Sequence, residues 1–218
     1  MSASEATVFV VDDDASVRRS LARLLRTAHW NVETLPTARA FLQRVSVSKP
    51  GCVVLDVRMP EMTGPELHDR MREMELSLPV VFLTGHGDVP TSVQAMKRGA
   101  VDFLLKPVDA GVLLKTVARA VEWHTAKLAQ QRGTQHIAGR LALLTVRERE
   151  VLDAVIKGHR NKQIAADLGI SEKTVKVHRG RVMDKMEARS VAELIHLCGV
   201  AGIGPNPAAA KRADSSER

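Results

Sequence analysis

The sequence predicts a parallel α/β domain followed by a small all-helical domain. Between residues 7 and 124, short apolar runs rich in β-branched residues alternate with segments whose apolar residues recur at helical spacing. From Thr145 onward the pattern is helical only, and capping residues and glycines mark the expected helix ends. Regular alternation of strands and helices is typical of a parallel sheet covered on both faces.

The first domain contains five strand-like segments, each followed by a helix-like segment. The expected strands are TVFVVD, NVETL, CVVLD, PVVFLT and VDFLL, in that order. The expected helices cover residues 15–28, 37–45, 64–74 and about 89–98, and a last helix begins near Asp109 and continues past Trp123. In a sheet of this kind, the ligand site lies at the carboxyl ends of the strands. We therefore expect an α/β domain at 1–124 with its site at that edge.

Residues 125–143 differ from their surroundings in being rich in Gln, Ala and Arg, with weak periodicity. Because Gly133 and Gly139 interrupt them, we expect a helix extension followed by a linker. Residues 144–204 should form the helical domain, and the Pro-, Ala- and Ser-rich tail at 205–218 should be disordered.

Capping residues predict four helices in the second domain. Thr145 and Glu148 match a capping box that opens a helix to about Lys157. The expected N-caps of the three later helices are Asn161, Ser171 and Ser190.

Composition and charge limit the kind of protein this is. Apolar residues make up 44% and charged residues 26%, which is typical of a soluble globular chain. No apolar run is long enough to span a bilayer, no signal peptide is visible, and the two cysteines have no metal-site spacing, so we expect a cytoplasmic protein. Residues 1–124 are electrically balanced, whereas residues 125–204 hold most of the net charge of +7. This excess indicates either a solvated basic surface or a polyanionic partner.

Polar side chains follow the predicted strands at the points where the strands end. They are Asp12, Asp13, Asp14, Asp56, Thr84 and Lys106. Adjacent carboxylates repel one another unless a cation lies among them, and Mg2+ accepts one or two carboxylates while leaving room for phosphate oxygens. A single Asp at a strand end is most often a cap or turn residue. The whole set favours a reaction in which a carboxylate attacks phosphorus to form an aspartyl phosphate.

Residues 7–124 resemble a two-component receiver domain. The motifs VVDDD, VVLDVRMPEMTG, VVFLTGHGD and AMKRGAVDFLLKP carry the resemblance. It implies a flavodoxin-like sheet of five parallel strands in the order 2-1-3-4-5 with helices on both faces, and Asp56 as the phosphoacceptor. The implied donors to Mg2+ are Asp12, Asp13, Asp56 and the backbone carbonyl of Arg58.

The resemblance also assigns the remaining residues of this edge. Thr84 would be the switch hydroxyl, Phe103 the switch aromatic and Lys106 the lysine that binds phosphate. The Lys106–Pro107 peptide bond would be cis. Asp14 should cap the helix that follows it.

Two other phosphate-handling families fit the sequence less well. A phosphatase of the haloacid-dehalogenase type has a second Asp two residues after its nucleophile, and Arg58 stands there in this chain. A nucleotide-binding fold has a Gly-rich loop after its first strand, where this chain has three acidic residues that repel phosphate.

The segment 171–186 has two faces when it is drawn as a helix. One face holds Val175, Val182 and Met186, with Met183 beside them, and is the expected core side. The opposite face holds Lys173, Lys176, Val177, Gly180 and Arg181. This pattern is typical either of a solvated helix with one exposed valine or of a recognition helix in the major groove of DNA. The helix-turn-helix spacing and the basic charge favour the second.

The segment from LTVREREVL to ELIHL resembles a LuxR/NarL-type DNA-binding domain of four helices. The resemblance implies that Lys176 and Val177 contact bases, while Glu148 is structural. The implied phosphate contacts are Lys173, Thr174, Arg179, Arg181 and Lys185. The family often has a basic or polar residue where Gly180 stands, so one common contact is missing. The helix that begins near Ser190 resembles the family's dimerisation element.

The whole chain thus resembles a response regulator of the NarL/FixJ type. The implied function is phosphorylation-dependent transcriptional regulation, in which phosphorylated Asp56 promotes receiver pairing and DNA binding. The implied partners are a sensor histidine kinase, double-stranded DNA half-sites, a second copy of the chain and RNA polymerase. As an enzyme, the chain would act only on its own phosphoryl group. Two alternatives stay open, namely DNA binding that needs no phosphorylation and a small phosphatase acting on a free substrate.

Overall fold

The computed structural model describes residues 6–45, 48–85 and 101–203, which belong to two compact units, Met1–Ala129 and Gln130–Arg218. The helix expected at about 89–98 and the tail expected at 205–218 lie outside the described residues. No helix within the described ranges is both long and apolar enough to cross a membrane.

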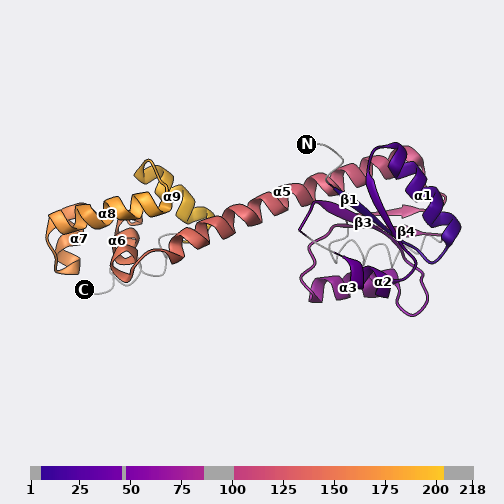
Figure 1. The fold of residues 1–218 in the computed structure, drawn as a ribbon, viewed down its shortest axis with the longest axis horizontal. Helices are drawn as coiled ribbons and strands as arrows, with labels where there is room; N and C mark the ends of the chain where they lie inside the picture. The colour runs from indigo at the N-terminus through magenta and orange to yellow at the C-terminus, as the bar shows by residue number, and fades with distance from the viewer. Residues whose placement is uncertain (1–5, 46–47, 86–100, 204–218) are drawn as a thin grey trace, which may run out of the picture. The chain divides into compact units, whose positions relative to one another are not determined.

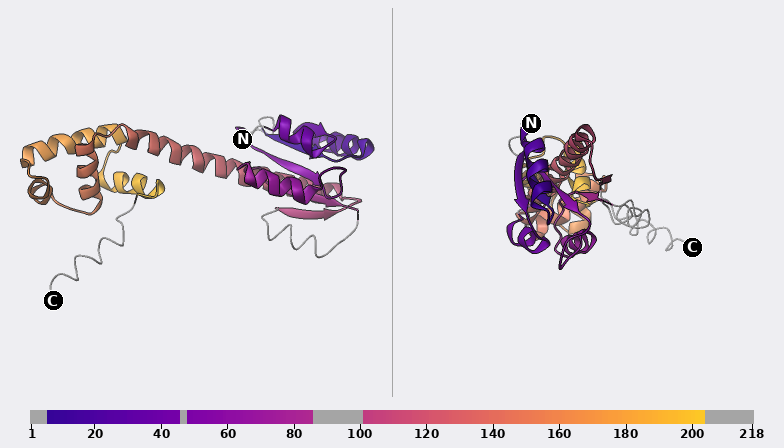
Figure 2. Two further views of the ribbon diagram at one scale, coloured as in Figure 1. Left: turned by 90° about the horizontal axis from the view of Figure 1, so that it is seen from below. Right: turned by 90° about the vertical axis from the view of Figure 1, so that its right-hand side faces the viewer.

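The first unit is built on a five-stranded sheet in which all neighbouring strands are parallel (Figures 1 and 2). The strands are β1 (Thr7–Val11), β2 (Asn31–Leu35), β3 (Gly51–Asp56), β4 (Val80–Thr84) and β5 (Asp102–Leu105). Their order, β2-β1-β3-β4-β5, confirms the predicted fold class.

Helices cover both faces of this sheet (Figure 1). Their bounds are α1 Ala15–Thr27, α2 Ala38–Arg44, α3 Gly64–Glu73 and α5 Ala110–Ala142. Because successive strand residues point to opposite faces, Val54 packs with α1 and α5 residues such as Leu25 and Leu113. The next residue, Leu55, packs on the other face with Phe41 of α2 and Leu67 of α3. The central strands are therefore buried on both sides, which holds their carboxyl ends in place.

A buried histidine ties α5 to the strand that carries Asp56. The backbone N–H of Gly51 donates to Nδ1 of His124 at 3.0 Å, and the imidazole is fully buried. Burial lowers the pKa of His124, so the ring stays neutral and keeps Nδ1 available as an acceptor.

Side-chain caps begin the helices near the sheet edge. The Asp14 carboxylate accepts from the backbone N–H of Ser16 at 2.7 Å, which confirms its predicted role as the cap of α1. Thr63 and Glu66 form a capping box at the start of α3. The Asp14 cap lies in the acidic turn after β1, and the Thr63 cap follows the loop after Asp56, so each fixes where its helix begins.

Gly64 is required where α3 begins, because the helix starts against the backbone of Asp56. A Cβ atom added at Gly64 would lie 2.3 Å from the Asp56 carbonyl oxygen, which is closer than a side chain tolerates. The Gly64 N–H donates to the carbonyl of Val57 at 3.0 Å, so the close approach is held by a hydrogen bond.

The second unit contains the end of α5 and four further helices. They are α6 Val146–Ile156, α7 Asn161–Leu168, α8 Glu172–Met186 and α9 Val191–Val200. Leu152, Ile164, Val175 and Leu194, one from each helix, are fully buried in its core. The capping box of Thr145 and Glu148 is confirmed, and so are the caps Ser171 and Ser190.

The structure corrects the expectation that Gly133 and Gly139 break the helix before a linker. Both glycines lie inside α5, which continues without interruption to Ala142. A glycine in a helix costs only about 0.5–1 kcal/mol relative to alanine. Ile137 and Leu141 are buried in the core of the second unit, and this apolar burial offsets that cost.

The predicted cap of α7 was also wrong by one residue. Arg160 occupies the N-cap position, and its backbone N–H donates to Oε1 of Gln163 at 2.8 Å. Asn161 is the first helical residue, and its side-chain oxygen accepts a hydrogen bond from Arg179 of α8 at 3.0 Å. The Asn161 side-chain oxygen, which a local cap would have used, therefore accepts its hydrogen bond from Arg179 on α8.

Glu148 links the start of α6 to the end of α8. Its buried carboxylate accepts hydrogen bonds from Nζ of Lys185 at 2.6 Å and from the backbone N–H of Thr145 at 2.9 Å. The bond from Lys185 contributes most to lowering the pKa of Glu148 from 4.5 to about 2. Because the folded-state pKa lies below the unfolded one, this contribution to stability is complete above pH 4.5 and is lost as the pH falls toward 2.

Substituting Gly64 with alanine should destabilise the first unit by about 1–3 kcal/mol, the usual range for overpacking a tight site. Urea unfolding followed by tryptophan fluorescence measures this, because Trp30 and Trp123 both lie in the first unit. Gly85→Ala is the matched control in the same unit, since a Cβ atom there meets nothing within 4 Å. An unchanged unfolding midpoint for Gly64→Ala would show that the close approach to Asp56 imposes no constraint.

The Glu148 carboxyl should titrate with a midpoint near 2, and Lys185→Met should move that midpoint up toward 4.5. The measurement is the pH dependence of the Glu148 side-chain carbonyl 13C shift in the full chain. Glu150→Gln is the control, because its exposed ion pair with Arg147 does not involve this carboxylate. A midpoint near 4.5 in the unsubstituted chain would contradict the structural role of Lys185.

Candidate functional site

The register of the sheet brings the predicted residues of the first unit to one edge. Val11 of β1 pairs with Leu55 of β3, so Asp12 and Asp56 are the next residues on neighbouring strands. Asp56 pairs with Leu83 of β4, and Thr84 pairs with Leu105 of β5. Lys106 follows directly after β5, and its peptide bond to Pro107 is cis, as predicted.

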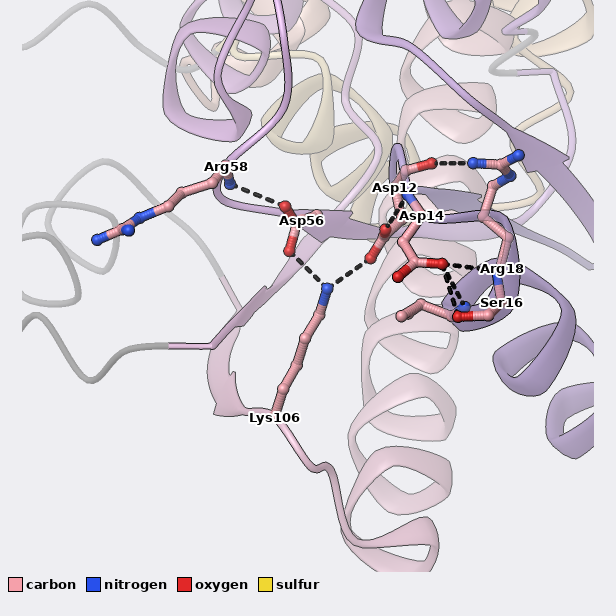
Figure 3. Close-up of polar contacts among 8 residues, drawn as sticks. Asp12, Asp14, Ser16, Arg18, Asp56, Arg58 and Lys106 are labelled. Carbon is pink, nitrogen blue, oxygen red and sulfur yellow. Dashed lines mark hydrogen bonds and ion pairs between the residues drawn. The ribbon is translucent and has the colours of Figure 1, made fainter.

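The ammonium of Lys106 joins the two buried carboxylates of this edge (Figure 3). Nζ lies 2.6 Å from Oδ2 of Asp12 and 2.7 Å from Oδ1 of Asp56. Asp12 is only 1% exposed and Asp56 6%, so water cannot solvate either charge well. The lysine therefore supplies the countercharge that allows two carboxylates to be buried side by side.

Backbone groups hold the remaining oxygens of the two carboxylates. Oδ2 of Asp56 accepts the backbone N–H of Arg58 at 2.9 Å, and Oδ1 of Asp12 accepts the backbone N–H of Asp14 at 2.8 Å. The guanidinium of Arg18, on α1, donates to the carbonyl oxygen of Asp12 at 2.6 Å (Figure 3). These bonds fix the orientation of both carboxylates and of the acidic turn.

The charges at this edge do not fully balance. Burial raises the pKa of the Asp56 carboxyl above its usual 3.8, and the hydrogen bond from Lys106 opposes this only in part. Burial by itself lowers the pKa of Lys106, but the hydrogen bonds to Asp12 and Asp56 outweigh it and hold the pKa above 10.5. Two carboxylates thus face one ammonium, and a further positive charge would stabilise the ionised form of Asp56.

The oxygen donors at this edge fit a hard divalent cation such as Mg2+. Asp12 and Asp56 are brought together, and Asp13, next to Asp12 in the chain, is exposed. Among the described residues, no three carboxylate, imidazole or thiol side chains gather closely enough to enclose a metal by themselves. Mg2+ needs no such cage, because it usually takes one or two carboxylates and completes its shell with water or phosphate.

Thr84 ends the strand next to this site, and Phe103 lies in the neighbouring strand β5. Thr84 is 3% exposed, and its carbonyl oxygen accepts the backbone N–H of Lys106 at 2.7 Å. Phe103 is half-buried, and its ring centroid lies 6.2 Å from that of Phe82 in the core. Thr84 therefore lies at the carboxyl end of β4, as the sequence predicted, whereas Phe103 is the second residue of β5.

In the second unit, α8 presents the two faces expected from its sequence. Val175, Val182 and Met186 are buried, whereas Val177 is 49% exposed. The exposed cations of α8 are Lys173, Lys176 and Arg181, and Thr174 is half-buried. An apolar side chain among cations is the arrangement that suits contact with a thymine methyl between phosphates.

The structure gives two of the predicted phosphate contacts other partners. Nη1 of Arg179 donates to the side chain of Asn161, so it fastens α8 to α7. Lys185 donates both to the buried Glu148 and to the carbonyl oxygen of Leu143 at 3.0 Å. These two cations are engaged within the second unit, and the free positive charge of α8 lies on Lys173, Lys176 and Arg181.

Sequence reasoning missed three residues that support these sites. Arg18 secures the acidic turn, and a basic residue one turn into a helix carries no signal for this contact. Gly64 makes the close approach to Asp56, and a glycine directly after a helix cap is the only sequence hint of it. Arg140 binds the end of α8, from a segment that the sequence suggested was a linker.

Comparisons with known proteins match both units of the chain. Residues 8–118 match the family "Response regulator receiver domain", and residues 142–198 match "Bacterial regulatory proteins, luxR family". The transcriptional regulatory protein FixJ of Rhizobium meliloti is 42% identical over 93% of this chain and 100% of its own length. The tetrathionate response regulatory protein TtrR of Salmonella typhimurium is 44% identical over 87% of this chain and 90% of its own.

A solved structure agrees as well. The response regulator StyR has a TM-score of 0.84 and 44% identity, covering 89% of this chain and 98% of that one. The chain therefore belongs to the response regulators, in which a receiver domain is joined to a LuxR-type DNA-binding domain, and it is a transcriptional regulator similar to FixJ.

Proposed function

We propose that a sensor histidine kinase phosphorylates Asp56 and that this modification controls DNA binding by α8. The observation that carries the proposal is the Lys106 ammonium, which lies between two buried carboxylates at the carboxyl edge of the sheet. An oxygen of Asp56 attacks the phosphorus of a phosphohistidine. The P–O bond forms as the P–N bond breaks, the bond electrons go to the departing imidazole nitrogen, and that imidazole takes a proton from water.

The chain's own residues prepare Asp56 for this attack. The backbone N–H of Arg58 orients one carboxylate oxygen, and Lys106 lies where it can also bind the oxygens of the incoming phosphoryl group. Asp12, Asp13 and Asp56, with the carbonyl of Arg58, would hold Mg2+. When bound, Mg2+ supplies positive charge that neutralises the phosphoryl oxygens during transfer.

Phosphorylation of Asp56 adds negative charge near Thr84 and Phe103. In the proposal, this charge changes the conformation of the surface around the site. In the proposal, the Thr84 hydroxyl moves to the phosphoryl group and Phe103 turns further inward, so that two receivers pair. Pairing then brings two DNA-binding domains to adjacent half-sites. The exposed Val177 and Lys176 would contact bases, while Lys173 and Arg181 would contact phosphates.

The proposal includes the cellular setting and the limits of the activity. The chain would work in the cytoplasm, with RNA polymerase as the partner through which it alters transcription. It would catalyse only the transfer to its own Asp56 and the slow loss of that group. A phosphatase acting on a free substrate would instead release inorganic phosphate over many turnovers.

Asp56→Asn should abolish phosphorylation of the chain by acetyl phosphate, because the amide is not nucleophilic and carries no charge to be stabilised. Intact mass spectrometry and a phosphate-affinity gel, each with and without Mg2+, measure the modified fraction. Asp69→Asn, a change of the same kind on the surface of α3, should leave phosphorylation unchanged.

Three results would contradict the proposal. The first is continued phosphorylation of Asp56→Asn, and the second is phosphorylation of the unsubstituted chain at equal rates with and without Mg2+. The third is DNA affinity that is the same for the modified and unmodified chain, which would favour binding that needs no phosphorylation.

Lys176→Ala should weaken binding to a duplex selected from a random pool by about 1–3 kcal/mol, the range for a lost base contact. Lys173→Ala should instead reduce the slope of log K against log salt by about 1, because one phosphate contact is lost. Fluorescence anisotropy over a range of salt concentrations separates the two effects. Lys115→Ala removes one charge from the receiver and is the control. If Lys115→Ala weakens DNA binding as much as either α8 variant, α8 is not the recognition helix.

A further inference from the structure

The carboxyl ends of α5 and α8 meet in the second unit, and Arg140 of α5 caps the end of α8. Its Nη1 donates to the carbonyl oxygen of Met186, the last residue of α8, at 3.0 Å. Its Nη2 forms an ion pair with the carboxylate of Glu187, the C-cap residue of α8. A guanidinium at a helix carboxyl end both satisfies a free carbonyl and opposes the negative end of the helix dipole.

The contact is reciprocal, since a cation of α8 caps the end of α5. Nζ of Lys185 donates to the carbonyl oxygen of Leu143, the first residue after α5, at 3.0 Å. The same ammonium bonds Glu148, which begins α6. Three helix ends are thus joined by two cations, and each cation comes from the helix opposite to the carbonyl that it caps.

We call the polar contacts of Arg140 and Lys185 with the two helix ends the clamp. Apolar packing beneath the clamp also holds the two helix ends together. Ile137 and Leu141 of α5 are 5% and 7% exposed, and they belong to the same buried cluster as Val182 and Met186 of α8. The Arg140 side chain is 16% exposed, whereas its partner Glu187 is 67% exposed, so the guanidinium is shielded from water but the carboxylate is not. The partly buried hydrogen bond from the guanidinium to the Met186 carbonyl is charge-assisted, and such bonds are stronger than neutral ones.

The geometry points to Arg140 as a positioning residue for the recognition helix, which makes the end of α5 a working part of the DNA-binding unit. The segment that matches the LuxR family begins at residue 142, so Arg140 and Ile137 lie outside it. This inference rests on the proposed role of α8 in reading DNA.

The position of Arg140 explains how it can act on DNA recognition without touching DNA. It fixes the carboxyl end of α8, whereas Lys176 and Val177 lie in the amino-terminal half of the same rigid helix. Without Arg140, apolar packing alone would hold the carboxyl end of α8, and the helix could tilt about that end. Such a tilt moves the residues at the amino-terminal end of α8 the most. A small loss of orientation is enough to misplace base contacts, while phosphate contacts tolerate it better.

The test is DNA binding by full-length Arg140→Met, with the duplex selected by the unsubstituted chain and with a scrambled duplex of the same length. The substitution should weaken binding to the selected duplex roughly ten-fold, the effect of losing one charge-assisted hydrogen bond. Affinity for the scrambled duplex and the salt slope should both stay unchanged, because no phosphate contact is lost. Circular dichroism defines a temperature at which every variant is fully folded.

Glu187→Gln provides a second variant, and Lys157→Met provides a control. Glu187 is the exposed partner of Arg140, so its substitution keeps the fold while weakening the clamp. The double variant Arg140→Met, Glu187→Gln should bind no more weakly than Arg140→Met alone, since both changes break the same interaction. Lys157→Met, at an exposed position outside the clamp, removes the same charge and should have no effect.

Hydrogen exchange gives a readout that is independent of DNA. Backbone amides in the last turn of α8 should exchange faster in Arg140→Met, and those in its first turn should not. Wild-type affinity for the selected duplex in Arg140→Met would overturn the inference, and so would a reduced salt slope, which would mean direct phosphate contact. If Lys176→Ala also binds normally, the assignment of α8 as the recognition helix fails, rather than the clamp alone.

Discussion

The ammonium of Lys106, shared by Asp12 and Asp56, is the interaction on which the first unit depends. Burying two carboxylates at the ends of neighbouring strands is unfavourable unless a cation lies between them. The cation comes from the end of β5, so the site exists only when β1, β3 and β5 are all in register. The same arrangement leaves Asp56 short of positive charge, which is why it suits a divalent cation.

The second unit uses cations in a different way, because there they join helix ends to one another. Lys185 and Arg140 bind the free carbonyls after α5 and at the end of α8, and Lys185 also neutralises the buried Glu148. A basic residue on α8 thus has one of two roles, which its surroundings decide. Lys173 and Lys176 face solvent and are available to DNA, whereas Lys185 and Arg179 are engaged by other helices.

The sequence predicted most where local rules act. Capping residues such as Asp14, Thr145 and Ser171 begin helices in the structure as expected, because their hydrogen bonds reach only two or three residues along the chain. It failed where a distant partner decides the outcome. Asn161 looks like a cap but accepts a hydrogen bond from Arg179, and the glycines of α5 stay helical because Ile137 and Leu141 are buried nearby.

The sequence by itself determined the strand and helix order, the acidic edge with Asp56, and the basic helix at 172–186. Periodicity, capping and strand-end carboxylates are local patterns, and the strand order followed from the family motifs. Only the tertiary structure decided that Gly64 must lack a side chain and that Arg18 hydrogen-bonds to the acidic turn. It also decided that Arg140 hydrogen-bonds to the carboxyl end of α8. These depend on close contacts between different segments, and the spacing of residues along one chain carries no record of such contacts.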